Sequence, residues 1–100
     1  MDTQSAIRAL AHLWGSVAES RQRSLTESEI KDMRRLCDNL NGGVPRRTAF
    51  NGAIGNLCLR LYSCGIFEVG RAPQGLDEIL EDIDRLREML TGTARPQTQT

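Results

Sequence analysis

The sequence predicts an all-α protein: a compact four-helix bundle with a central apolar third helix and a disordered C-terminal tail. Three observations lead to this fold class. Apolar residues recur at helical spacing in four successive segments. The third segment is apolar or small over roughly two thirds of its circumference, and residues 91–100 are small and polar. We therefore expect a single helical domain over 1–90 and a disordered polar tail over 91–100.

Length and composition are those of one globular domain. The chain has 100 residues, of which 39% are hydrophobic and 26% are charged. The formal net charge is zero, which weighs against a broad electrostatic footprint for nucleic acid. Residues 41–73 are mainly basic and residues 74–100 mainly acidic, so these two parts can neutralise each other within one fold.

The first helix is expected to run from a cap at Thr3 or Ser5 to about Arg21. Its apolar residues fall in one arc and its polar residues opposite, which is typical of a half-buried amphipathic helix. The residues of the buried arc are Ile7, Leu10, Leu13, Trp14, Val17 and Ala18.

The second helix has the clearest start signal in the chain. Residues 26–29, Thr-Glu-Ser-Glu, form a capping box, and Leu25 and Ile30 flank it as a hydrophobic staple. Its buried stripe continues toward Leu40. The helix ends at Asn41-Gly42-Gly43, because glycine adopts the left-handed conformation without a steric penalty.

The third helix, around Phe50–Tyr62, is the one around which the others are arranged. Gly52, Ala53 and Gly55 remove side-chain bulk and would let a neighbouring backbone approach, although each glycine costs about 1 kcal/mol of helix propensity. We expect neighbouring elements to cover this helix on several sides. Its first apolar stripe is Phe50, Ile54, Leu57, Cys58 and Leu61, and its second is Gly55, Leu59, Tyr62 and Ile66.

The boundaries of the third helix are less clear than its centre. Val44-Pro45 would open it, since proline suits the first helical position, and Thr48 as a cap gives a second possible start. Ser63–Gly65 closes it. We expect Ile66–Gly70 to form an apolar strap over the core, because a lone strand would have no partner, with a break at Ala72-Pro73.

The fourth helix is expected from about Leu76 to Leu90, with acids in its first turn and an ion pair between Glu81 and Arg85. A narrow heptad seam is expected to pack within the chain, against the third helix. A parallel coiled-coil dimer, with Asp82 and Arg87 paired between chains, stays open. The residues of the seam are Leu76, Ile79, Ile83, Leu86 and Leu90.

No group of residues in the sequence indicates catalysis. His12 is the only histidine and falls on a polar helix face with no positioned partner. Cys37, Cys58 and Cys64 lack the paired spacing of a zinc site and are expected to be reduced, buried thiols. We predict no enzyme activity, no cofactor and no metal. We see no signal-peptide pattern and no apolar run near the ~20 residues of a membrane span, so we expect a cytoplasmic protein away from membranes.

Arg46 and Arg47 admit two interpretations. In the first turn of a helix, two cations face the positive end of the helix dipole, and a bound phosphate or carboxylate would relieve this. The simpler expectation is that they pair with the acids of the last helix. A helix-turn-helix formed by residues 26–41 and 45–64, with Arg46, Arg47, Thr48 and Asn51 reaching DNA, is the alternative function. The zero net charge makes nucleic acid the less favoured partner.

The sequence therefore predicts a small non-enzymatic protein-binding regulator, of the adaptor, inhibitor or antiactivator type, that docks on a larger protein and forms a homodimer. Arginine-rich usage, with Lys31 as the only lysine, indicates a bacterial or phage genome. We expect the strap and the flank of the last helix to remain as apolar surface. The candidate partner-binding residues are Arg46, Arg47, Ile66, Phe67, Val69, Ile83, Leu86 and Arg87.

Overall fold

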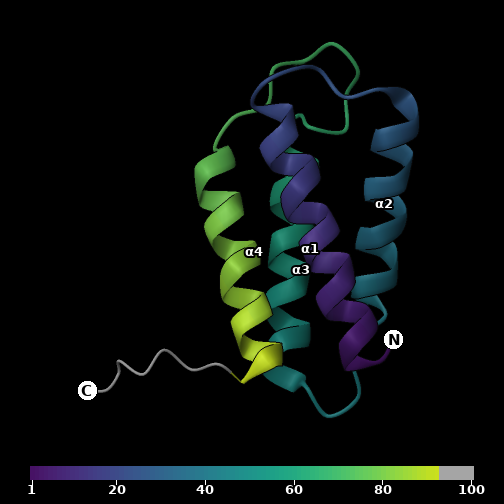
Figure 1. The fold of residues 1–100 in the computed structure, drawn as a ribbon, viewed down its shortest axis with the longest axis vertical. Helices are drawn as coiled ribbons and strands as arrows, with labels where there is room; N and C mark the ends of the chain where they lie inside the picture. Colours follow the sequence, from purple (N-terminus) through teal and green to yellow (C-terminus); the bar gives the residue numbers. More distant parts are fainter. Residues whose placement is uncertain (93–100) are drawn as a thin grey trace.

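The computed structural model describes residues 1–92, which fold as four helices with no strand among them. These are α1 (Thr3–Ser20), α2 (Glu27–Asn41), α3 (Thr48–Ser63) and α4 (Leu76–Thr91). Successive helices alternate in direction, and α1 and α3 each contact both α2 and α4 (Figure 1). The predicted all-α four-helix bundle is confirmed. The tail predicted for 91–100 begins inside α4, and from residue 93 onward it lies outside the described residues.

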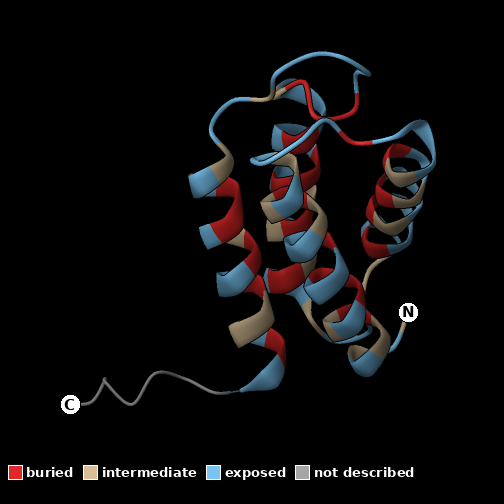
Figure 2. Cartoon of the chain, turned by 45° about the horizontal axis from the view of Figure 1, so that its top comes forward, coloured by how far each residue is buried: buried red, intermediate tan, exposed pale blue. Residues whose placement is uncertain are grey.

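The core lies along the bundle axis and is mainly aliphatic. Each helix turns its buried residues inward and its exposed residues to solvent (Figure 2). None of the described polar or charged residues is buried, and each fully buried aliphatic side chain contributes about 1.5–3 kcal/mol through removal from water. The largest fully buried side chains include Leu10, Leu13, Met33, Phe50, Ile54, Leu61 and Ile83.

The start of α1 differs from the expected cap. Asp2 is the N-cap, with extended backbone, and its carboxylate accepts a hydrogen bond from the Ser5 amide at 2.7 Å. The prediction of Thr3 or Ser5 as the cap is therefore wrong. That hydrogen bond lowers the pKa of Asp2. Trp14 was assigned to the buried arc, but it lies at the edge of that arc and remains 36% exposed.

The expected capping box of α2 is present. The Thr26 hydroxyl accepts from the Glu29 amide at 3.2 Å, and the Glu29 carboxylate accepts from the Thr26 amide at 2.8 Å. Leu25 and Ile30, the predicted staple, are both buried. At the other end, Gly43 has a φ of 88° and turns the chain out of the helix. The sequence pattern therefore located both ends of α2.

The start of α3 lies later than Pro45. The helix begins at Thr48, and Arg46 has a left-handed φ of 68° in the loop before it. The cause is the Asn51 side chain, which accepts from the Val44 amide at 2.9 Å and donates to the Val44 carbonyl at 3.0 Å. This clamp holds the chain from Val44 onward as a turn. A helix opening at Val44-Pro45 is therefore wrong. The alternative start at Thr48 is the one found, although Arg47, and not Thr48, is the cap.

The segment between α3 and α4 closes one end of the bundle. Ile66 and Phe67 are buried against the core, which agrees with the predicted strap, whereas Val69 is 64% exposed. Glycines with positive φ at Gly65 and Gly70 turn the chain on either side of these residues. At Gly65 the φ of 92° favours glycine, and a Cβ there would also lie within 2.9 Å of the Arg71 side chain, which would have to shift.

The seam of α4 packs inside the bundle, as expected for use within one chain. Ile79, Ile83, Leu86 and Leu90 are buried. The ion pair predicted between Glu81 and Arg85 is replaced by one between Arg85 and Asp82, at 3.3 Å. Asp82 also pairs with Arg60 of α3 at 2.6 Å, which joins the basic middle of the chain to its acidic last helix.

Candidate functional site

Four of the predicted partner-binding residues lie in the core. Ile66, Phe67, Ile83 and Leu86 are all buried in the described chain. Their interpretation as leftover apolar surface is therefore wrong, because the seam of α4 faces the bundle interior and the strap covers the bundle end. A dimer through these residues would require the bundle to open. Val69 is the one apolar member of that set that is exposed.

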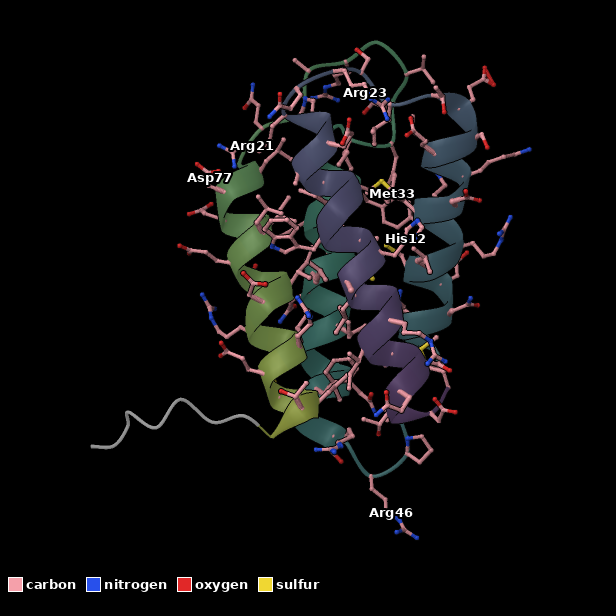
Figure 3. The ribbon with its side chains drawn as sticks, viewed as in Figure 1. His12, Arg21, Arg23, Met33, Arg46 and Asp77 are labelled. Carbon is pink, nitrogen blue, oxygen red and sulfur yellow. The ribbon has the colours of Figure 1, made fainter. Side chains whose placement is uncertain are left out.

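The three arginines of the predicted set lie apart from one another. Arg46 projects away from the bundle at the loop end (Figure 3). Arg47 donates to the Met89 carbonyl at 3.3 Å, near the C-terminus of α4, where the helix dipole favours a cation. Neither arginine lies in the first turn of a helix, so the proposed anion site does not form there. Neither pairs with an acid of α4 in the described structure. Arg87 lies 3.9 Å from Asp84, and its Nε is buried without a hydrogen-bond partner in the part that the structure describes.

Within α3, the second apolar stripe faces solvent, whereas Ile66, its last member, lies beyond the end of the helix and is buried. Leu59 is 66% exposed and Tyr62 is 49% exposed, so the expectation that neighbours would cover this stripe is wrong. At the helical positions that continue it, Gly52 and Gly55, no atom of the described chain lies within 4 Å of where a Cβ would be, outside the helix's own backbone and immediate neighbours. These glycines do not serve close packing within the bundle. We call Gly52, Gly55, Leu59 and Tyr62 the outer stripe of α3.

The Tyr62 end of the outer stripe is held by contacts with the strap. The rings of Tyr62 and Phe67 meet edge to face with centroids 4.8 Å apart. The Arg34 guanidinium of α2 lies 5.6 Å from the Phe67 ring centroid and donates to the Phe67 carbonyl at 3.3 Å. Partial burial, and then the nearby Asp38 carboxylate, raise the pKa of Tyr62. Tyr62 and Arg34 are thus positioned before any partner arrives.

Charged residues border the outer stripe on both sides. On α2, Lys31 and Arg34 are followed by Asp38 at helical spacing. On α4, Glu78 and Asp82 are followed by Arg85. The hydrogen bond of Arg34 to Phe67 and the ion pair of Arg60 with Asp82 place these two rows beside the C-terminal half of α3. Along α2 the charge therefore changes from positive to negative, and along α4 it changes from negative to positive.

A crevice of about 620 Å³ lies at the end of the bundle, between the α1–α2 connection and the segment before α4. Its arginines are already paired with carboxylates: Arg21 with Asp77 at 3.1 Å (Figure 3), Arg23 with Glu29 at 2.6 Å and Arg71 with Glu68 at 2.7 Å. These exposed pairs contribute little stability individually. They leave the crevice without a spare cation for an anionic ligand.

The expectation of buried thiols holds for Cys37 and Cys58 and is wrong for Cys64. Cys37 and Cys58 are buried and free, and Cys64 is half-buried and free. The Cys58 Sγ lies 3.8 Å from the Cys37 carbonyl. A hydrogen bond with the Cys58 thiol, and then burial, raise the pKa of Cys37, which keeps this thiol protonated and unreactive. Within residues 1–92 no three His, Cys, Asp or Glu side chains gather closely enough to hold a metal ion.

The geometry of α2 and α3 differs from a helix-turn-helix. The two helices run side by side in opposite directions along the bundle (Figure 1), whereas a helix-turn-helix crosses its helices at about 90–120°. Asn51, assigned to DNA in that interpretation, bonds Val44 through both polar atoms of its side chain.

Comparisons of the chain with protein-family models, with curated proteins and with solved structures give no match. Within residues 1–92 no helix is both long enough and apolar enough to cross a bilayer. The outer stripe of α3 was present in the sequence as a helical pattern, but Leu59 and Tyr62 were not among the predicted site residues. Two glycines on one helix face, in line with two large apolar residues, were the signal that could have identified them.

Proposed function

We propose that this chain is a small non-enzymatic protein-binding regulator, of the adaptor, inhibitor or antiactivator type, which docks on a larger protein through the outer stripe of α3. The observation that supports this most strongly is the exposure of Leu59 and Tyr62 on a helix whose opposite face is fully buried. Large apolar side chains grouped on a surface are a feature of interaction sites.

The residue types of this surface suit a protein partner. Tyrosine and arginine are the residues over-represented among those that dominate binding energy, and Tyr62 and Arg34 meet here. Both are held by Phe67, so binding would order few new side chains, which lowers its entropic cost. Gly52 and Gly55 leave space for a partner backbone to approach the helix.

The proposed compartment and the proposed source of the chain rest on other observations. Three free cysteines favour a reducing compartment such as the cytoplasm, and the arginine-rich composition favours a bacterial or phage source. The helix-turn-helix alternative has no observation in its favour in the described structure. The clamp of Asn51 on Val44 and the antiparallel packing of α2 beside α3 both count against it.

The test is affinity capture from a lysate of the source organism with the wild-type chain and a Leu59→Glu variant. Leu59 is exposed, so this change should leave the fold intact. We expect a protein captured by the wild type to be lost with the variant. A Gly15→Gln variant, altered at an open position on α1, serves as the matched control and should capture the same protein. Equal capture by wild type and Leu59→Glu would refute docking through this face.

A further inference from the structure

The side chains of the outer stripe of α3 are small in its first half and large in its second half, so the stripe is complementary in shape to a second copy that runs in the opposite direction. Its N-terminal half consists of Gly52 and Gly55, and its C-terminal half of Leu59 and Tyr62. When a second α3 is laid against it end for end, Leu59 of each chain lies over Gly55 of the other, and Tyr62 lies over Gly52. In a parallel pair, glycine would meet glycine and tyrosine would meet tyrosine, so that the helices would be forced apart at one end.

The charges beside the stripe complement themselves in the same arrangement. In the end-for-end pair, the α2 row of one chain faces the α2 row of the other. The contact of Cys58 with the Cys37 carbonyl places Asp38 close to the level of the two-fold. Arg34 of one chain then lies about four residues, or about 6 Å, along the axis from Asp38 of the other, as in an i,i+4 ion pair. On the other side, Asp82 already pairs with Arg60 and Arg85 of its own chain, so the α2 row carries the charge argument. Lys31 and Arg34 make no ion pair with a carboxylate in the described structure, so Arg34 can pair with Asp38 of a second copy.

We propose that a second copy of this chain occupies the outer stripe, in a two-fold dimer in which the two α3 helices pack antiparallel. The inference rests on the proposed function only in taking this face as an interaction surface. It identifies a second copy of the chain as a partner that binds there. Two-fold dimers bring the same patch of each chain together. The order of side-chain sizes fits only the antiparallel arrangement, and Arg34 and Asp38 of α2 give that arrangement an ion pair between the chains. It replaces the dimer predicted through Ile83, Leu86 and Arg87, whose two apolar members are buried.

Sedimentation of the purified full-length chain, at concentrations up to about 100 µM, tests the proposal. We expect a wild-type dimer and a Leu59→Glu variant whose dimer dissociates at least tenfold more readily. Gly55→Gln is the sharper variant. Space is open at this position and the residue is helical, so the monomer should melt at a higher temperature while the dimer weakens. Gly15→Gln, at an open helical position on α1, should leave the dimer unchanged.

A charge exchange tests the orientation. Arg34→Asp places two acids against each other in the antiparallel pair and should weaken the dimer. Adding Asp38→Arg restores an opposite pair across the interface and should recover most of the loss. In a parallel pair, the α2 row would face the α4 row, and the double variant would recover nothing. Because both variants lose the contact of Arg34 with Phe67, comparing the single with the double variant isolates the interchain effect.

Two results would overturn the proposal: a wild type that stays monomeric at about 100 µM, or a dimer that neither Leu59→Glu nor Gly55→Gln weakens. These outcomes are distinct from failure of the proposed function. A monomeric wild type with Leu59-dependent capture from the lysate would remove the homodimer and leave docking on another protein. If Leu59→Glu weakened the dimer but left capture from the lysate unchanged, the homodimer would stand and docking of another protein through this face would be refuted.

Discussion

Two leucines of α3 provide the most direct test of how this helix is packed. Leu61 is fully buried, whereas Leu59, two residues earlier on the same helix, is 66% exposed. Truncation of Leu61 to alanine removes buried methyl groups and leaves a cavity, which costs about 2–5 kcal/mol. The same truncation at Leu59 removes atoms already in water, so we expect a change within about 0.5 kcal/mol.

Urea denaturation followed by circular dichroism measures both changes. For a domain of this size, 1 kcal/mol corresponds to about 4–8 °C in melting temperature, so in a parallel thermal melt Leu61→Ala should lower the melting temperature by roughly 8–40 °C. The measurement is made at low protein concentration, so that dimerisation through Leu59 does not contribute. Equal destabilisation by the two variants would mean that both faces of α3 are covered, and the account of the outer stripe would be wrong.

Three further results are expected. Hydrogen bonds from Arg23 lower the pKa of Glu29 to about 2, below its usual 4.5. The stabilisation from the Glu29 carboxylate should therefore be present above about pH 5 and be lost as the pH falls toward 2. Denaturant titrations of the wild type and a Glu29→Gln variant should converge over that range, and a constant difference would contradict it. Asn51→Ala should cost about 1–3 kcal/mol, since the buried Val44 loses both hydrogen bonds from the clamp; an unchanged denaturation midpoint would argue against it. Cys64 is half-buried while the other two cysteines are buried, so a thiol reagent should label Cys64 first in the folded protein, as mass spectrometry of the digested chain would show.

The sequence predicted those elements whose signals are local. The capping box at Thr26 and Glu29, the staple at Leu25 and Ile30, and the heptad seam of α4 depend on residues only a few positions apart, and each is found in the structure. Periodicity was also sufficient to indicate four helices. Asp2 was missed as a cap although its residue type is a favoured one, because Thr3 and Ser5 offered equally good local patterns.

The errors concern contacts between distant residues or the coverage of a surface. Proline at position 45 indicated an early start of α3, and only the clamp of Asn51 on Val44 explains the later one. Periodicity identified two apolar stripes on α3, but it does not state how many neighbours a helix has. With α2 and α4 as its contacts, α3 can bury one stripe and not the other. The predicted site residues consequently fell on buried Ile83 and Leu86 and missed exposed Leu59 and Tyr62.

The central claim is that the outer stripe of α3 is the surface through which this chain meets another protein. Photo-crosslinking in the source organism tests it directly, with p-benzoylphenylalanine placed at Leu59 in one variant and at His12, exposed on α1, in another. We predict a discrete crosslinked product from position 59, to a second copy or to a larger protein, and none of that mass from position 12. The absence of any product at position 59, or the same product from both positions, would contradict the claim.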